Sequence, residues 1–393
     1  MRRNETYICA ERQEEGYGLF AKVIHKSALQ NGVLLGGILL TGGALLVWPE
    51  GVAGGISRGL SICGTVLIPS LFPFLVLAGL LVRSGLAETL GRRTGRLTRA
   101  LFGLPGCCGA VILVGMVGGY PAGGLAVGEL VRKGAIPPAE GRRLLRFCVN
   151  GGPAFIISAV GAGLLGSVRK GVLLFAAHIA VSLLMGIAGR RGGRTTEVGG
   201  TRPAGGGRTP LAAAFVESVN AAGRSLLYMC GFVILFAAVL ALADVSGLAA
   251  GFQWLIAWPF VRLGADPAVF ACVLPCVLEV SCGCVEAAGN GLFAAFLLGA
   301  ALGWGGLSVH CQLAATLQEY HLLDRGFFTA RFWHGLLAGG LSALLFRVAP
   351  IPVEVGTVAG DALIRPVSTS VAASVALLMM CSVLLLATDR ERR

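Results

Sequence analysis

Apolar runs of about 20 residues follow one another along nearly the whole chain, and short polar segments separate them. A helix rises about 1.5 Å per residue, so a run of this length crosses roughly 30 Å of hydrocarbon. The runs lie near residues 29–48, 57–82, 104–128, 144–166, 168–188, 212–243, 250–263, 269–290, 291–315, 327–348 and 368–387. This pattern predicts an all-α polytopic membrane protein.

The composition agrees with this pattern. Of the 393 residues, 55% are hydrophobic and 13% are charged, and the mean hydropathy is +0.79. Such values are typical of a lipid-embedded chain and exclude a soluble enzyme or a nucleic-acid-binding domain. The net charge of +12 comes from Arg and Lys residues in short loops, as the positive-inside rule expects. We therefore expect the lipid bilayer, and no nucleic acid, as a partner.

A polar stretch rich in Gly, Arg and Thr, residues 189–210, divides the apolar chain into two halves. The predicted organisation is a cytoplasmic N-terminal segment (1–28), a first transmembrane span and loop (29–56), a first repeat (57–188), a cytoplasmic linker (189–210), a second repeat (211–349), and an outer loop, last span and C-terminal tail (350–393). Basic residues near both ends predict that the N- and C-termini are cytoplasmic.

The apolar run 104–128 has basic loops on both sides, at 83–99 and 132–146. A single crossing cannot return to its own side of the membrane, whereas a re-entrant helical hairpin can. Gly118 to Gly124 reads GGYPAGG and predicts the turn of such a hairpin at membrane depth. Asn150 to Pro153 predicts a second interruption. Non-helical backbone is tolerated there only where protein or a cavity covers it, which is typical of transport sites.

The two halves show a faint internal repeat. Ser84 to Ala87 recurs 162 residues later as Ser246 to Ala249, and the same offset aligns Gly119 to Pro121 with Ser281 to Gly283. The latter segment is therefore predicted to be the turn of a second hairpin. The first copy begins outside and the second begins inside, so the copies are inverted repeats. Such repeats are a hallmark of secondary transporters with a substrate site near the bilayer midplane.

Ionisable side chains inside apolar runs are costly and are therefore functional candidates. Glu279 and His310 are predicted to act in coupling or gating. An anionic substrate would be bound by backbone N–H groups at helix N-termini and glycine turns, with polar side chains refining the fit. The predicted substrate-binding residues are Gly119, Tyr120, Asn150, Gly151, Gly305, Ser308 and Gln312.

Each of these candidates has a structural alternative. The glycines could serve close helix packing, and Asn150 and Ser308 could form interhelical hydrogen bonds. The alternating polar residues Ser308, His310 and Gln312 suggest an extended or broken stretch. A further set of histidines is interpreted as interfacial or packing residues: His178, His321 and His334.

Other chemistries find no support in the sequence. The scattered cysteines mostly lie in or beside apolar runs, where thiols act as small apolar groups, and no zinc-ligand spacing is present. We expect no metal and no cofactor. The chain has no phosphate-binding Gly-x-x-x-x-Gly-Lys-Ser/Thr motif and no zinc-protease helix, so neither an ATP-driven pump nor an enzyme is expected. Whether the chain forms a homo-oligomer stays open.

Four motifs resemble those of a known family: Gly118 to Gly124, Glu140 to Ile156, Leu278 to Val280, and Gly305 to Gln312. Together, and in this order, they are similar to the YlbJ family of sporulation integral membrane proteins, also called stage V sporulation protein SpoVV. The resemblance covers roughly residues 30–350. Related nucleoside-recognition "gate" membrane proteins share the Asn-x-x-Pro element seen here at Asn150 to Pro153.

The resemblance implies a fold like that of the concentrative nucleoside transporters, in the mother-cell membrane around the forespore. The implied cargo is dipicolinic acid, moved out of the mother-cell cytosol toward the forespore. Dipicolinate is a planar dianion, so Glu279 is expected to serve coupling or gating rather than direct contact. The chain departs from the family pattern at Ser281 to Cys284, where a more polar turn is expected. Two alternatives are a transporter of nucleosides or related heterocycles and a non-transporting spore-envelope scaffold.

Overall fold

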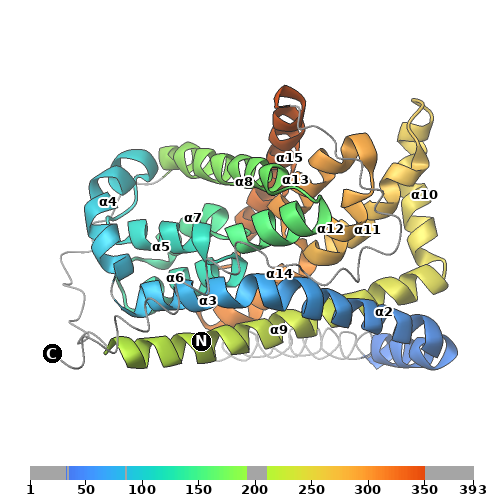
Figure 1. The fold of residues 1–393 in the computed structure, drawn as a ribbon, viewed down its shortest axis with the longest axis horizontal. Helices are drawn as coiled ribbons and strands as arrows, with labels where there is room; N and C mark the ends of the chain where they lie inside the picture. Colours follow the sequence, from blue (N-terminus) through green and yellow to red (C-terminus); the bar gives the residue numbers. More distant parts are fainter. Residues whose placement is uncertain (1–31, 33–34, 85, 193–209, 350–393) are drawn as a thin grey trace, which may run out of the picture. The chain divides into compact units, whose positions relative to one another are not determined.

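The computed structural model describes residues 32, 35–84, 86–192 and 210–349. The predicted segment 1–28, most of the linker 189–210, and all of 350–393, with its predicted last span, lie outside these residues. Every regular element in the described part is a helix (Figure 1), as the all-α prediction requires.

The chain divides into two units, one ending at Ala53 and the other beginning at Gly54. In the first unit, an apolar helix, Leu35–Val47, lies within the predicted run 29–48. Helix α2, Pro49–Ile62, contains the boundary between the units. All elements after α2 belong to the second unit, which contains the candidate site.

Four helical segments are long and apolar enough to cross a membrane: Pro49–Leu80, Val168–Ala188, Leu211–Val245 and Ala294–Tyr320. Their outward faces carry large apolar side chains. On the longest of them, for example, Leu227 is 74% exposed and Tyr228 is 71% exposed. Apolar faces of this extent are typical of helices that lipid surrounds.

The first half continues from α2 through a short π-helical turn and a series of α-helices, with a second π-helical segment between α7 and α8. These elements are η1 (Cys63–Leu67), α3 (Ile68–Arg83), α4 (Leu86–Phe102), α5 (Cys108–Val117), α6 (Tyr120–Arg132), α7 (Pro138–Cys148), η2 (Ala154–Leu164), α8 (Val168–Ala188) and η3 (Gly189–Gly192).

The second half has a similar order of elements. They are α9 (Leu211–Val245), α10 (Leu248–Val261), η4 (Pro267–Cys272), α11 (Val273–Leu278), α12 (Val280–Ala288), η5 (Gly291–Phe293), α13 (Ala294–Trp304), α14 (Gly306–Leu317), η6 (Gln318–Tyr320) and α15 (Arg325–Val348). In each half, a long helix and a shorter one precede two broken helix pairs and a final long helix. The duplication and its inverted orientation in a membrane stay predictions.

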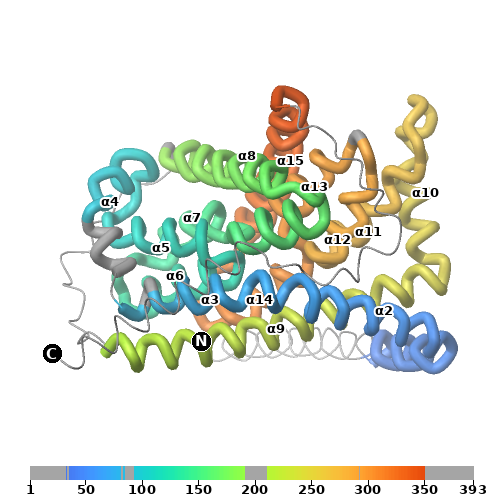
Figure 2. Tube along the Cα trace, viewed as in Figure 1, coloured from blue at the N-terminus to red at the C-terminus, as the bar shows by residue number. Residues whose placement is uncertain are grey.

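The halves pack against each other through several helix pairs. Helix α3 lies along α9, as the tube in Figure 2 shows, and α8 packs on α15. Helix α6 contacts α14, and α13 packs along much of α15. These contacts bring the broken helix pairs of the two halves together.

Two predicted loops are largely helical. The basic segments 83–99 and 132–146 are expected to be loops, but most of the first belongs to α4 and most of the second to α7. For α4 the reason is visible in the sequence, since leucines recur at helical spacing, at positions 86, 90, 97 and 101. A basic amphipathic helix of this kind is typical of a membrane surface, so its charge remains compatible with the cytoplasmic side.

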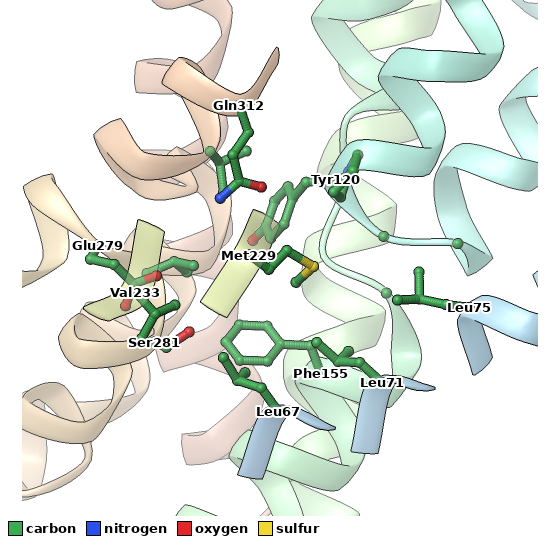
Figure 3. A pocket seen from close by; sticks show the side chains of 16 residues that line it. Leu67, Leu71, Leu75, Tyr120, Phe155, Met229, Val233, Glu279, Ser281 and Gln312 are labelled. Carbon is green, nitrogen blue, oxygen red and sulfur yellow. The ribbon is translucent and has the colours of Figure 1, made fainter. Parts of the chain in front are cut away.

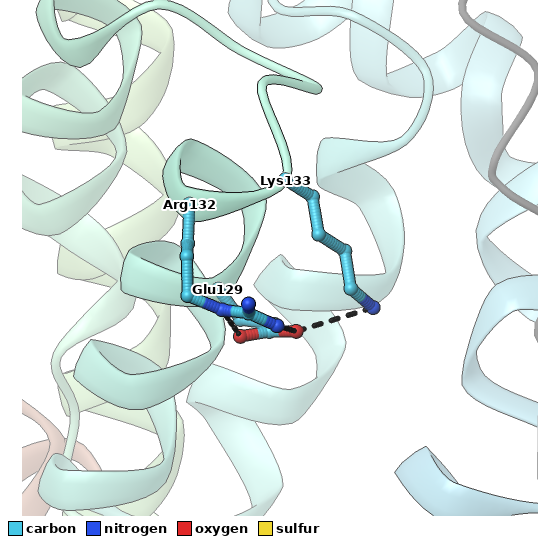
Figure 4. Close-up of polar contacts among 3 residues, drawn as sticks. All are labelled: Glu129, Arg132 and Lys133. Carbon is cyan, nitrogen blue, oxygen red and sulfur yellow. Dashed lines mark hydrogen bonds and ion pairs between the residues drawn. The ribbon is translucent and has the colours of Figure 1, made fainter.

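The end of α6 carries a small exposed ion cluster (Figure 4). Glu129 accepts two hydrogen bonds from Arg132, of 2.6 and 2.7 Å, and its carboxylate lies 3.3 Å from the Lys133 ammonium. Exposed pairs at these helical spacings contribute only a few tenths of a kcal/mol. The cluster therefore marks a polar end of the α5/α6 pair rather than a functional site.

Helices α5 and α6 approach each other at glycines. A Cβ atom on Gly123 would lie 3.1 Å from Cα of Gly115 and would collide with the carbonyl oxygen of Cys148. A Cβ on Gly115 would meet the same carbonyl. Close packing therefore explains these two glycines, and it explains how the end of α7 can lie against both helices.

We predict that Gly123→Ala lowers the free energy of unfolding by about 1 to 3 kcal/mol, because backbone atoms must move to admit the methyl group. The matched control is Gly231→Ala on α9, where a Cβ would have nothing within 4 Å; it should leave stability unchanged or slightly raised. Thermal unfolding in detergent measures both. Equal midpoints for the two variants would contradict this account of the packing.

Candidate functional site

Four interruptions of the helices lie close together in the second unit. They are the Gly118–Gly119 turn between α5 and α6, residues 149–153 between α7 and η2, Glu279 between α11 and α12, and Gly305 between α13 and α14. Within the first half, a Cβ on Gly152 would lie 3.1 Å from the Gly119 nitrogen. Within the second half, a Cβ on Gly306 would lie 2.8 Å from the Val280 nitrogen. The interruptions therefore form two contacting pairs.

Glycine is required at two of the four interruptions. Gly119 has φ 84° and ψ 176°, and Gly305 has φ 86° and ψ −6°. These conformations are costly for residues with a Cβ atom. The predicted interruptions at Gly118 to Gly124 and at Asn150 to Pro153 are confirmed as breaks between helices, although their depth in a membrane is not determined.

The predicted turn at Ser281 to Gly283 is wrong. These residues lie inside α12, and the chain breaks two residues earlier at Glu279, which has extended backbone with φ −144° and ψ 124°. The cause is the Glu279 side chain, whose Oε2 accepts a 2.7 Å hydrogen bond from the Cys282 backbone N–H. The carboxylate caps the helix and so begins it. The Ser308 hydroxyl donates to the other oxygen at 3.4 Å.

Two hydrogen bonds join the interruptions of one half to those of the other. The Tyr120 hydroxyl donates to the Leu302 carbonyl at 2.6 Å, and Nη1 of Arg331 donates to the Val149 carbonyl at 2.6 Å. The first bond runs from the first half to the second, and the other runs in the reverse direction. All four breaks are therefore held in one cluster.

Histidines and an amide support this cluster from the first half. The Gly151 N–H donates to Nε2 of His178 at 3.2 Å, and Nδ2 of Asn150 donates to the Phe147 carbonyl at 2.8 Å and to Ser182 Oγ at 3.1 Å. The rings of His178 and His334 lie 4.4 Å apart, centroid to centroid. Both histidines are fully buried, so of the two predicted roles, interfacial or packing, the structure shows packing for His178 and His334. His321 is exposed.

A small cavity lies where the interruptions meet (Figure 3), with about 530 Å³ of empty space when the open solvent at its mouth is counted. Polar groups are contributed to its lining by Gly119, Tyr120, Gly152, Glu279, Ser281 and Gln312, and apolar side chains by Leu67, Leu71, Leu75, Phe155, Met229 and Val233. The first residues of α6 and α12, and the first turn of η2, all contribute to the lining. The cavity thus combines an apolar wall with helix N-termini and one carboxyl group.

Of the predicted site residues, four line this cavity: Gly119, Tyr120, Glu279 and Gln312. Asn150, Gly151, Gly305 and Ser308 belong to the same interruptions but lie behind the lining. For Asn150 the interhelical hydrogen bond is the role that the structure shows. Ser308 and Gln312 lie on the regular helix α14, so the predicted extended stretch is wrong and the break precedes them at Gly305.

His310 also lies away from the cavity lining. Its Nε2 is 3.0 Å from the Trp304 carbonyl oxygen, and the ring packs between Trp304, Phe327 and Phe328. Its coupling role stays a prediction that the geometry does not favour.

The residue that the sequence reasoning missed is Arg331. It is one of few charged residues in the apolar run 327–348, and it is 1% exposed. The rule that singled out Glu279, a charge inside an apolar run, could also have found Arg331.

The comparisons with known proteins give one relative. The chain is 28% identical over 312 residues to the sporulation integral membrane protein YlbJ of Bacillus subtilis (strain 168), a match that covers 74% of this chain and 76% of that protein. The predicted resemblance to the YlbJ family is confirmed. No family model and no solved structure matches the chain.

YlbJ is described as an integral membrane protein. Together with the four membrane-length apolar helices, the similarity to YlbJ supports a multi-pass integral membrane protein here. The elements that form the cavity, from α3 to α14, span most of the chain, so the site belongs to the body of this membrane protein rather than to an appended domain.

We predict that the Glu279 cap depends on an acceptor oxygen and not on charge. Glu279→Gln retains a side-chain oxygen that can accept from the Cys282 N–H, so stability should change little. Glu279→Ala removes the cap and should lower the free energy of unfolding by about 1 kcal/mol. Thermal unfolding of the purified protein checks the order. A Gln variant as unstable as the Ala variant would contradict the capping role.

Proposed function

We propose that this protein transports a small planar anion, dipicolinate, across a membrane during endospore formation, without hydrolysing ATP. The sporulation context comes from the YlbJ relative, whose name states it, and the cargo is the one that the family resemblance implies. In this proposal the membrane is that of the mother cell around the forespore.

The observation that carries the proposal is the cavity at the four helix interruptions. Broken helices in lipid-embedded proteins are tolerated where they line a cavity, and in secondary transporters they form the substrate site. Placing the α5/α6 and α11/α12 pairs in the membrane as re-entrant hairpins, and the two halves as inverted repeats, puts this cavity near the midplane. The hydrogen bonds from Tyr120 to Leu302 and from Arg331 to Val149 would then break and re-form during the transport cycle.

The lining suits a flat ring that carries carboxylates. The N-termini of α6 at Tyr120 and of α12 at Val280 place the positive ends of two helix dipoles at the cavity. The Gln312 amide and the Ser281 hydroxyl can donate further hydrogen bonds. The wall that contains Leu71, Phe155 and Met229 can cover a ring face.

Glu279 is the only acidic side chain among the described residues that line the cavity. An ionised carboxylate would repel a dianion at this range, so binding of the cargo favours protonation of Glu279. In this proposal Glu279 couples cargo binding to proton binding. Its hydrogen bond to the Cys282 N–H holds the start of α12.

We predict that purified protein in liposomes moves labelled dipicolinate, and that Gln312→Leu weakens its apparent affinity about tenfold through loss of one hydrogen bond to a charged group. The matched control is Thr316→Val, one turn further along α14 and exposed, which should behave as the wild type. Absence of flux above empty vesicles under every imposed ion gradient would contradict the transport proposal.

The runner-up is transport of nucleosides or related heterocycles. It is favoured by the aromatic and aliphatic cavity wall, which would also accept a neutral base, and by the Asn-x-x-Pro element shared with gate proteins. The same liposome assay decides between the two cargoes. Competition of dipicolinate flux by excess uridine or adenosine would support nucleosides, and lack of competition supports the dianion.

A non-transporting scaffold makes a different prediction in spores. When this chain replaces the resident YlbJ-type protein, Glu279→Gln should give spores that contain less dipicolinate and lose heat resistance, because the carboxyl group couples transport although its loss spares the fold. Spore dipicolinate and survival after heating, at matched protein levels, measure this. Unchanged spores would favour the scaffold.

A further inference from the structure

Arg331 is a buried positive charge without an acidic partner. It lies on α15 and is 1% exposed. Among the described residues, the ion pairs involve Arg83, Arg132, Lys133 and Arg146, and none involves Arg331. A guanidinium in such a position is costly unless other groups offset its charge.

Backbone carbonyls at the ends of two broken helices provide this compensation. Besides the bond from Nη1 to Val149, Nη2 of Arg331 donates to the Gly303 carbonyl, and Nε donates to the Trp304 carbonyl at 3.5 Å. Val149 is the C-cap of α7, while Gly303 and Trp304 end α13. The C-terminus of a helix carries a partial negative charge, so two helix ends from opposite halves share one guanidinium.

The neighbouring histidines add no charge. Nδ1 of His334 lies 3.0 Å from Nη1 of Arg331 and must accept from it, and Nε2 lies 3.0 Å from the His178 carbonyl oxygen, to which it donates. His334 is therefore neutral, with its proton on Nε2. Nε2 of His178 accepts from Gly151, so it carries no proton there. Arg331 is left as the fixed cation of this cluster.

Only one side chain separates this cation from the cavity. The guanidinium carbon lies 5.9 Å from the centroid of the Tyr120 ring, and Tyr120 lines the cavity. In a water-poor interior a charge acts over such a distance with little screening. The two helix C-termini, at about half a negative charge each, offset most of the guanidinium charge, but the N-termini of α6 and α12 at the cavity add about half a positive charge each. The sum of these charges is positive at the cavity when Glu279 is protonated.

We infer that Arg331 gives the cavity its preference for an anionic over a neutral solute, while its bonds to Val149 and Gly303 position the cavity walls. This inference rests on the proposed function and adds the source of its charge selectivity. Arg331 acts from behind Tyr120 and does not touch the solute.

The test measures equilibrium binding of three probes that share one ring: dipicolinate, its monoamide and its neutral diamide. Purified full-length wild type, Arg331→Lys and Arg331→Gln are compared, with thermal unfolding of each. Wild type should bind the probes in order of their charge. Arg331→Gln should bind dipicolinate at least about tenfold more weakly, and the diamide within about threefold of wild type. Arg331→Lys keeps the positive charge but loses the planar guanidinium group, and it should retain most of the preference for the dianion.

The outcomes separate the two claims. Wild type that binds none of the probes overturns the proposed function and this inference with it. If wild type binds dipicolinate and a folded Arg331→Gln variant still prefers the dianion, the inference is overturned but the proposed function is not. If Arg331→Gln does not fold, the Lys variant decides: a folded Arg331→Lys that loses its charge preference, or weakens for all three probes equally, shows a purely structural role and overturns the inference.

Discussion

The structure depends on one constraint: each break in a helix frees backbone N–H and C=O groups, and in apolar surroundings each freed group must find a partner. The side chains that meet this need are few. Glu279 accepts from the Cys282 N–H in the first turn of α12, and His178 accepts from the Gly151 N–H. Tyr120 and Arg331 donate to carbonyls at the ends of α13 and α7. Without these partners the breaks would be costly enough to favour continuous helices.

The same partners connect the two halves. Tyr120 reaches from the first half to the end of α13, and Arg331 reaches from the second half to the end of α7. The same hydrogen bonds therefore satisfy the backbone groups at the breaks and join the two halves. The cavity lies beside them because the opened backbone at Gly119, Gly152 and Glu279 leaves room that regular helices would fill.

Much of this arrangement could be predicted from the sequence. Glycine pairs and the Asn-Gly-Gly-Pro segment predict breaks in helices because backbone freedom is a local property of these residues. The breaks at Gly119 and Gly152 are therefore predicted correctly. The break at Glu279 was misplaced by two residues, since a helix cap depends on where a carboxylate folds back. The contacts of Arg331 and His334 could not be predicted, because they join residues 182 and 156 positions apart.

The account's central claim is that the cavity between the four interruptions holds a planar anion. A structure determined with saturating dipicolinate tests it most directly. The account predicts density for the ring inside the cavity that Phe155, Ser281 and Gln312 line, with its carboxylates toward the starts of α6 and α12. An empty cavity, with dipicolinate bound elsewhere on the protein or not at all, would contradict it.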